Sequence, residues 1–358
     1  MKRREILRGV TLMPFLSAQI FEENRQIAVN QEIKRKKIVK PKRLEKGETI
    51  GIVAPAGPLS QEVVETCVLN LEKLGFKVRV GKNVLAQNGY LAGTDAQRAE
   101  DLMWAFSEKD IRCIWCIRGG YGAMRILPML DFNVIKKNPK LMIGYSDITA
   151  LHLAIHQRTG LVTLHGPAGN LDYSDFTRPY VLDMLTKPTP QYALKNAEEN
   201  LKNESNLFKL ETITAGKCRG QLIGGNLSLL SAMDGTPFQM KDIKGKILFL
   251  EDIEERPYRV DRMLTQMLQA HDFKQLAGIA CGVFEGCNPK ENEKSLSLID
   301  VLRDRLGNLG IPVVYGLSFG HIKSQYTIPV GIMAELDSTP IDKNTNDSIF
   351  TLLESATF

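Results

Sequence analysis

From Glu48 onward, short apolar runs alternate with longer stretches of helical periodicity. Residues 49–54 form an apolar run typical of a buried strand, and the apolar residues of 63–74 recur at helical spacing until Gly75. Thr94 and Gln97 form a capping box that predicts the start of a further helix. Additional strands are predicted at 77–80, 111–117, 141–144 and 161–164. Because parallel strands need a crossover helix between them, this order predicts βαβ units in a parallel sheet.

A polar segment at 188–206, which contains two prolines and many Asn and Glu residues, precedes a second alternation of this kind. There we expect strands near 218–223, 246–250, 278–284, 313 and 332, and helices near 226–233 and 258–269. The sequence therefore predicts two α/β domains, 48–187 and 211–358, joined by a linker at 188–210 and separated by a cleft.

The basic excess of the chain is confined to its N-terminal segment. Residues 1–47 carry 13 Lys/Arg and 5 Asp/Glu, whereas the whole chain has a net charge of +5, so the remainder is slightly acidic. Arg3 and Arg4 precede an apolar run at 9–21, an order that resembles a twin-arginine export signal. We therefore expect an export signal at 1–25, a basic linker at 26–47 and a periplasmic or exported location. A basic arm on a cytoplasmic protein is the alternative.

The same segment argues against two kinds of partner. Residues 34–46 are basic but lack the interleaved aromatic residues on which nucleic-acid bases stack, so no nucleic-acid partner is predicted. The apolar run at 9–21 is shorter than the roughly 20 residues that span a bilayer. We therefore expect no stable membrane insertion after processing.

Cys113 and Cys116 form a C-x-x-C pattern inside the predicted strand at 111–117. Residues three apart in a strand point to opposite faces, so the two thiols cannot easily share a metal or a disulfide. We interpret them as buried structural thiols, and no paired C-x-x-C or H-E-x-x-H pattern elsewhere in the chain supports a zinc site.

A sharp turn at 144–147 places Ser146 between a predicted strand and a helix. A serine at such an elbow projects from the sheet beside backbone N–H groups that can hold a developing oxyanion. The alternative is that Ser146 or Asp147 simply caps the following helix.

Two more strand ends carry candidate residues. Arg118, Gly119, Gly120, Tyr121 and Gly122 follow the strand at 111–117, and consecutive glycines let the backbone approach a ligand closely. A second loop brings Glu251 and Asp252 to the carboxyl end of a predicted strand, where α/β proteins bind their ligands. A solvated loop is the alternative for the acidic residues.

Five histidines could serve as a base for a serine nucleophile. His152 and His156 lie four residues apart on the helix after Ser146, and we expect them at the core rim or surface, with a metal pair as the weaker alternative. His271 follows a helix end and is interpreted as structural. His165 and His321 each follow a predicted strand, and the residues alone do not separate them as the base.

Eight motifs in a fixed order resemble those of the LD-carboxypeptidases, a serine peptidase family that also contains microcin C self-immunity peptidases. The resemblance covers about residues 48 to 340. The motifs are Ala-Pro-Ala-Gly (54–57), Arg-Gly-Gly-Tyr-Gly (118–122), Ile-Gly-Tyr-Ser-Asp (143–147), His-Gly-Pro (165–167), Gly-Gly-Asn-Leu (224–227), Leu-Glu-Asp (250–252), Tyr-Arg-Val-Asp-Arg-Met-Leu (258–264) and Phe-Gly-His (319–321).

This resemblance implies a flavodoxin-like parallel sheet in the first domain, a mixed α/β second domain, and an active site in the cleft between them. It implies a triad in which Ser146 is the nucleophile, His321 the base and Glu251 its orienting partner. The backbone N–H groups of Gly120 and Asp147 would form the oxyanion hole. Further residues expected to contact substrate are Arg118, Gly119, Tyr121 and His165. No cofactor and no metal are implied.

The expected reaction is hydrolysis of the bond between an L-centre and the terminal D-Ala of murein tetrapeptides. Two alternatives stay open: an immunity peptidase that cleaves peptidyl- or aminoacyl-nucleotides, and a non-catalytic protein that binds murein peptides. The family also suggests a homodimer, which nothing in the sequence itself predicts.

Overall fold

The computed structural model describes residues 37–169, 173–339 and 349–358, and Ile38–Phe358 form one compact unit. The export signal predicted at 1–25, and the part of the basic linker before Lys37, lie outside the described residues. Within the described ranges, no helix has the length and apolar character needed to cross a bilayer.

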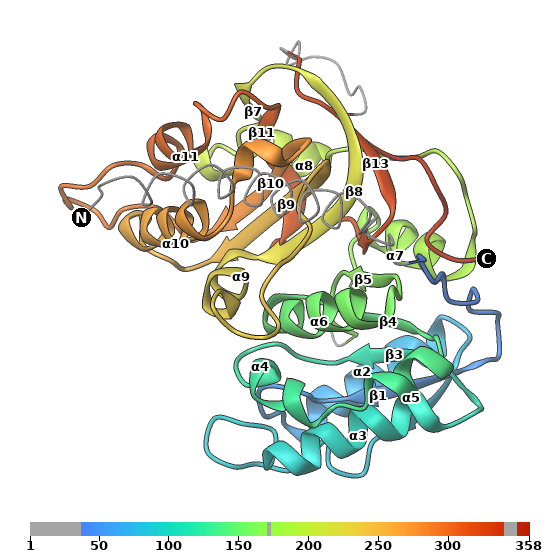
Figure 1. The fold of residues 1–358 in the computed structure, drawn as a ribbon. Helices are drawn as coiled ribbons and strands as arrows, with labels where there is room; N and C mark the ends of the chain where they lie inside the picture. The colour runs from blue at the N-terminus through green and yellow to red at the C-terminus, as the bar shows by residue number, and fades with distance from the viewer. Residues whose placement is uncertain (1–36, 170–172, 340–348) are drawn as a thin grey trace, which may run out of the picture. The chain divides into compact units, whose positions relative to one another are not determined.

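Six strands form the first sheet: β1 (Thr49–Val53), β2 (Lys77–Val80), β3 (Ile111–Cys116), β4 (Leu141–Gly144), β5 (Thr163–His165) and β12 (Ile328–Val330). Their order is β12-β5-β4-β3-β1-β2, and β1 to β5 are mutually parallel (Figure 1). The order 2-1-3-4-5 is that of flavodoxin-like folds, so the predicted parallel sheet is confirmed. The antiparallel edge strand β12 comes from the second half of the chain, an addition that the alternation did not predict.

Helices pack on both faces of this sheet. They are α2 (Gln61–Lys73), α3 (Asp95–Ser107), α4 (Ala123–Ile126), α5 (Phe132–Lys137), α6 (Thr149–Thr159) and α7 (Thr177–Thr186), with 3₁₀ turns η1 (Leu127–Met129) and η2 (Ser146–Ile148). The capping box predicted at Thr94 and Gln97 starts α3. Gly160 ends α6 in the left-handed conformation that glycine adopts without strain.

The alternating faces of β3 divide the buried core into two clusters. Cys116 packs with α3 and α6 in one cluster, whereas Cys113 and Trp115 pack with α2 in the other. The two thiols therefore point to opposite faces and are buried, as predicted. Burial raises the pKa of Cys116 to about 12, so it remains a neutral thiol at physiological pH.

The second sheet has eight strands in the order β6-β14-β13-β8-β9-β10-β11-β7. Its centre is parallel, from β8 to β11, and the strands flanking it are antiparallel to their neighbours, so the predicted mixed α/β character is confirmed. The strands are β6 (Tyr192–Leu194), β7 (Glu211–Thr214), β8 (Lys217–Asn226), β9 (Lys246–Ile253), β10 (Gly278–Glu285), β11 (Val313–Gly320), β13 (Met333–Asp337) and β14 (Phe350–Leu352). Its helices are α8 (Glu198–Leu201), α9 (Leu227–Met233), α10 (Pro257–Ala270) and α11 (Leu298–Leu306), with 3₁₀ turns η3 (Asn206–Phe208) and η4 (Phe273–Gln275).

The polar segment expected to be a linker contains β6, α8 and η3. Its prolines and Asn residues obscured the pattern, and polar contacts help to anchor the segment. The hydroxyl of Ser318 accepts hydrogen bonds from the backbone N–H of Ala197 and from the side chain of Asn200, both at 2.9 Å. The domain boundaries drawn from the sequence stay predictions.

A buried hydrogen bond joins the first turn of α6 to the end of β8. The hydroxyl of Thr149 accepts from the backbone N–H of Asn226 at 2.9 Å. A Cβ placed on Gly225 would lie 2.4 Å from the same hydroxyl, so only glycine allows this approach. The helix that follows Ser146 therefore contacts the strand beside β9, which carries Glu251.

Candidate active site

Ser146 lies one residue after β4, as the first residue of η2, and has a backbone φ of 61°. This left-handed conformation is uncommon for a residue with a side chain and often marks a functional site. The alternative that Ser146 or Asp147 caps the helix is wrong, because no side chain caps α6 or η2. The strained turn instead leaves the Ser146 hydroxyl without a structural partner among the hydrogen bonds of the turn.

The glycine loop after β3 covers this serine. A Cβ on Gly119 would lie 2.8 Å from Ser146 Cβ, 3.1 Å from its Oγ and 3.3 Å from the Asp147 nitrogen. Gly57 supports the loop from behind by donating its N–H to the Gly119 carbonyl at 3.0 Å. Gly120 follows with a φ of 103°, packed against Gly57. Gly119 thus comes close to the side chain of Ser146 and the backbone of Asp147. The prediction that these glycines let the backbone approach a ligand stays a prediction.

Asp147 is buried, and its side chain ties the serine turn to the glycine loop. Its Oδ2 accepts a hydrogen bond from the Ala123 N–H at 2.7 Å. Burial raises the pKa of this carboxyl to about 6, although the backbone hydrogen bonds and the charge of Arg98 oppose the rise. This hydrogen bond to the glycine loop was missed in the sequence, where Asp147 was considered for its backbone N–H and as an alternative helix cap.

Glu251 and His321 form the buried acid–imidazole contact of the site. Glu251 lies near the end of β9 and is fully buried, whereas His321 directly follows β11 and keeps 11% of its side chain exposed. The Nδ1–H of His321 donates to Glu251 Oε2 at 2.7 Å, across the width of β10. This contact leaves Nε2 as the nitrogen available to a reacting group.

The charges of this pair shift both pKa values in the directions that favour an ion pair. Burial by itself would lower the pKa of His321, but the charge and the hydrogen bond of Glu251 outweigh it, so the pKa lies above its ordinary value. Burial likewise disfavours the Glu251 carboxylate, but His321 more than offsets this, and the pKa of Glu251 is lowered.

His165, the other candidate base, occupies a different position. It ends β5 and is 1% exposed, with its Nε2 3.8 Å from Glu251 Oε1. Neither ring nitrogen has a hydrogen-bond partner in the described structure, and burial lowers the pKa of His165 to about 4. The His165 ring is therefore neutral at pH 7 and buried beside the Glu251 carboxylate. Of the two candidate bases, His321 is the one that is partly exposed.

Tyr145, which the sequence analysis did not single out, connects these groups. Its ring centroid lies 4.8 Å from that of His321 and 6.4 Å from that of His165. Because Tyr145 immediately precedes Ser146, this contact places His321 against the serine turn. A strand end of the first sheet and one of the second thus meet at the same place.

Asp252 is a second acid whose partners only the structure reveals. It is 2% exposed and accepts from Asn226 Nδ2 at 3.1 Å and from the Ser228 N–H and hydroxyl at 2.9 and 2.8 Å. Burial raises its pKa to about 6. These bonds hold the end of β8 against the end of β9, and so position Glu251. The motifs at 224–227 and 250–252 contained these residues but gave no indication of their roles.

The remaining predicted residues are distributed around the site. Arg118 is exposed and donates to the Pro58 carbonyl at 2.8 Å. Tyr121 is 54% exposed, with its ring 5.7 Å from that of Tyr90. His271 contacts Asp234 at 2.7 Å, which agrees with a structural role.

The expectation that His152 and His156 lie at the core rim or surface is wrong. Both are buried, because α6 is enclosed on nearly all sides. Their rings contact the carbonyls of Gly144 at 2.8 Å and Leu161 at 3.1 Å. Among the described residues, no group of three His, Cys, Asp or Glu is arranged to hold a metal ion.

Taken together, these contacts suit acyl transfer. A half-buried serine on a strained turn, a histidine with one nitrogen held by a buried carboxylate, and a glycine loop beside the serine are the parts that nucleophilic catalysis needs.

Comparison with known proteins gives two domain matches. Residues 50–166 match the LD-carboxypeptidase N-terminal domain, and residues 219–336 match the LD-carboxypeptidase C-terminal domain. The two matched segments contain every residue that we predicted for catalysis and for the oxyanion hole.

Individual relatives and solved structures are similar over most of the chain. A probable murein peptide carboxypeptidase of Bacillus subtilis is 43% identical over 300 residues, covering 84% of this chain and 92% of the relative. The crystal structure of a muramoyltetrapeptide carboxypeptidase from Oxalobacter formigenes has a TM-score of 0.71 at 30% identity, covering 85% of this chain and 97% of that one. The apo structure of a microcin C7 self-immunity protein has a TM-score of 0.77 at 26% identity, covering 89% and 100%.

The Glu251–His321 contact generates a prediction about proton affinity. We expect a His321 pKa above the ordinary value of about 6.5 in the wild type. The Glu251→Gln substitution removes the charge that raises this pKa and leaves the burial that lowers it, so the pKa should fall below that value. Histidine ring titration by NMR measures both, with His271 as an internal control because it pairs with Asp234 instead.

The raised pKa of His321 also predicts how the effect of this substitution on the unfolding free energy changes with pH. A raised histidine pKa stabilises the fold fully below the unfolded-state pKa, and this contribution is lost as the pH rises through the folded-state value. Glu251→Gln should therefore cost more unfolding free energy at pH 6 than at pH 9. An unchanged His321 pKa in the variant would contradict the contact.

Proposed function

The chain belongs to the LD-carboxypeptidase family, and from this premise we propose that it is a serine peptidase that releases the terminal D-Ala of murein tetrapeptides. The observation that carries the proposal is the buried Glu251–His321 hydrogen bond beside the strained turn of Ser146. Family membership supplies the class of reaction, and these side chains supply the means to perform it.

The first step is attack by Ser146 on the carbonyl of the scissile bond. A neutral His321 accepts the hydroxyl proton at Nε2 as the Oγ–carbon bond forms, because a serine hydroxyl alone is a weak nucleophile. Glu251 accepts the Nδ1–H, which fixes the tautomer, and its charge stabilises the imidazolium that results. The buried position of the carboxylate strengthens this interaction.

The negative charge that develops on the carbonyl oxygen is received by the backbone N–H groups of Gly120 and Asp147. Support for this assignment is the close approach of Gly119 to Ser146 Oγ and to the Asp147 nitrogen. Preorganised donors of this kind act at the transition state without reorganisation, and loss of one typically costs about 10²- to 10³-fold in kcat.

Collapse of the tetrahedral intermediate breaks the carbon–nitrogen bond. The imidazolium returns its proton to the departing amine of D-Ala and leaves an acyl-enzyme on Ser146. Water then attacks this ester with His321 again as base, so that the truncated peptide and free enzyme are regenerated. The protons balance over the cycle, and one water is consumed.

The substrate class is inferred from the relatives, whose names are murein peptide and muramoyltetrapeptide carboxypeptidases. Such a substrate ends in a carboxylate beside the scissile bond, and a cation is needed to bind it. We assign this role to Arg118, which precedes Gly119 and is exposed at the glycine loop, and we assign Tyr121 of the same loop to contact with the substrate.

An immunity peptidase acting on peptidyl- or aminoacyl-nucleotides is the competing function, supported by the similarity to the microcin C7 self-immunity structure. Its substrate carries a nucleobase, which would stack against an exposed tryptophan ring. The two tryptophans of the chain are engaged within the fold. Trp115 is buried and donates to the Pro167 carbonyl, and the guanidinium of Arg79 lies 5.1 Å from the Trp104 ring. We therefore favour the murein peptide.

Purified protein should release D-Ala from murein tetrapeptide, as measured by mass spectrometry, and a metal chelator should not stop the release. Ser146→Ala should lower kcat by about 10⁴-fold or more. Ser295→Ala, in an exposed position, is the matched control and should behave like the wild type.

Activity that survives in Ser146→Ala would refute the mechanism. Cleavage of an aminoacyl-nucleotide with no cleavage of tetrapeptide would favour the immunity function. If the wild type releases no D-Ala, and both it and Ser146→Ala bind the tetrapeptide, the result would favour a binding protein.

We further propose that the enzyme is exported, on the evidence of Arg3, Arg4 and the apolar run that follows. In a bacterial host, the wild type should appear in the periplasmic or extracellular fraction, as followed by immunoblot. Replacing both arginines by lysine should retain the chain in the cytoplasm. The control carries Lys36→Arg and Lys37→Arg in the basic linker and should be exported normally. Equal export of all three chains would disprove a twin-arginine signal.

A further inference from the structure

We propose that Arg98 is a positioning residue of the oxyanion hole, which acts by fixing the peptide group between Gly122 and Ala123. The inference rests on the proposed function, because it concerns the loop that carries the Gly120 donor. Arg98 lies on α3, in a helix that contributes no residue to the triad, and its sequence position gave no indication of such a role.

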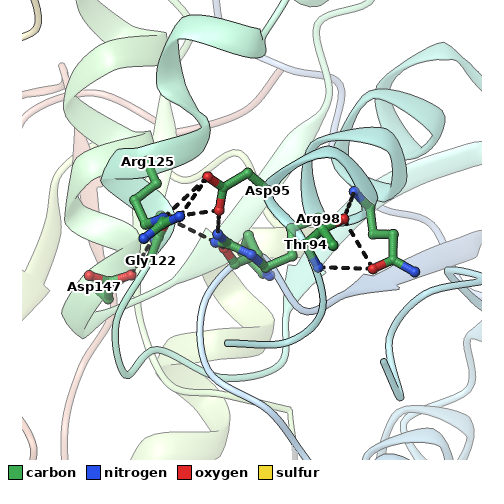
Figure 2. A network of polar contacts seen from close by, with 9 residues as sticks. Thr94, Asp95, Arg98, Gly122, Arg125 and Asp147 are labelled. Carbon is green, nitrogen blue, oxygen red and sulfur yellow. Dashed lines mark hydrogen bonds and ion pairs between the residues drawn. The ribbon is translucent and has the colours of Figure 1, made fainter. Parts of the chain in front are cut away.

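Arg98 is nearly completely buried, at 1% exposure, which is rare for arginine unless its donors are used. Its Nη1 donates to the carbonyl of Pro55 at 2.6 Å and to that of Gly122 at 2.8 Å. Its Nη2 forms an ion pair with Asp95, which in turn pairs with Arg125 (Figure 2). The guanidinium thus joins the loop after β1 to the glycine loop after β3.

Gly122 is shaped around this guanidinium. It has a φ of 127°, and a Cβ there would lie 2.7 Å from Arg98 Nη1. The residue must therefore be glycine for both conformational and steric reasons. The contact between Arg98 and the loop is consequently direct, with no side chain between the guanidinium and the backbone.

The opposite side of the same peptide group is held by Asp147. The Gly122 carbonyl accepts from Arg98, and the Ala123 N–H donates to Asp147 Oδ2 at 2.7 Å. A cation on the carbonyl and an anion on the N–H leave the peptide plane one orientation. Since Asp147 also carries the second proposed oxyanion donor on its own backbone, this single peptide group fixes the two donors relative to each other.

The charge of Arg98 also acts on Asp147. Burial raises the pKa of this carboxyl, and Arg98 opposes that rise. A buried carboxylate beside a developing negative charge would oppose catalysis if uncompensated. Arg98 therefore supports the transition state in a second way, by offsetting Asp147.

Arginine is required here because two nitrogens of one planar group are used: Nη1 donates to the carbonyls of Pro55 and Gly122, and Nη2 pairs with Asp95. The ammonium of lysine has one nitrogen, so it cannot take the places of both Nη1 and Nη2. Arg98→Lys keeps the charge but loses this geometry. It should therefore lower kcat even where the protein folds normally.

The test compares Arg98→Lys and Arg98→Ala with Arg125→Gln, which removes the other arginine bound to Asp95 but no contact to the loop. Both Arg98 variants should lose about 10- to 100-fold in kcat for D-Ala release, with KM changed by less than about threefold. Arg125→Gln should stay within about twofold of the wild type. Added guanidinium ion should restore part of the rate of Arg98→Ala, and sodium chloride at equal ionic strength should not.

A second measurement does not depend on the identity of the substrate. The rate at which a fluorophosphonate labels Ser146 also depends on the oxyanion donors, and it should fall in the Arg98 variants by a similar factor. If the Arg98 variants are labelled more slowly than the wild type, but the wild type releases no D-Ala, the proposed function would be refuted and the role of Arg98 supported. Should Arg98→Ala fail to fold by circular dichroism, the double variant Arg98→Met with Asp147→Asn, which removes both charges, should fold better than Arg98→Met.

Three results would overturn the proposal. An unchanged kcat and labelling rate in Arg98→Lys would make Arg98 purely structural. A raised KM at constant kcat would assign it to substrate binding instead. Loss of activity in Arg125→Gln equal to that in Arg98→Lys would show that the pairing with Asp95, and not the contact with the loop, is what matters.

Discussion

The site depends on one buried interaction, the hydrogen bond between the carboxylate of Glu251 and the imidazole of His321. A fully buried carboxylate is costly unless it is paired, so the second sheet must bring the ends of β9 and β11 to this separation, with β10 between them. The pairing uses Nδ1 of the imidazole, and in the proposed mechanism Nε2 then serves Ser146. Tyr145 then places the strained Ser146 turn of the first sheet against the same ring.

Most of the fold could be predicted from the sequence, because its signals are local. The apolar runs that became β1, β3 and β4 and the capping box of α3 lie within a few residues, where periodicity and capping determine structure. The strands β6 and β12 could not be predicted in this way. Each is three residues long, and each is held by pairing with distant strands, β14 and β5 respectively.

The sequence predicted which strand ends carry the candidate site, but not how their side chains contact one another. Ser146, Glu251 and His321 could be named from ordered motifs, yet local sequence left His165 equal to His321, and only the burial of His165 behind Glu251 separates them. The supporting residues gave still less signal. Arg98 contacts Pro55, 43 positions away, and Asp252 contacts Asn226, 26 positions away, so their partners are set by the packing of distant segments within each sheet and its helices.

The most direct test of this account is a crystal structure of the protein after reaction with a peptide boronic acid in which boron replaces the scissile carbonyl carbon. The account predicts a bond from Ser146 Oγ to boron, one boronate oxygen accepting from the N–H groups of Gly120 and Asp147, and His321 Nε2 hydrogen-bonded to the adduct. A boronate attached to another residue, or one whose oxygens face solvent away from both N–H groups, would contradict it.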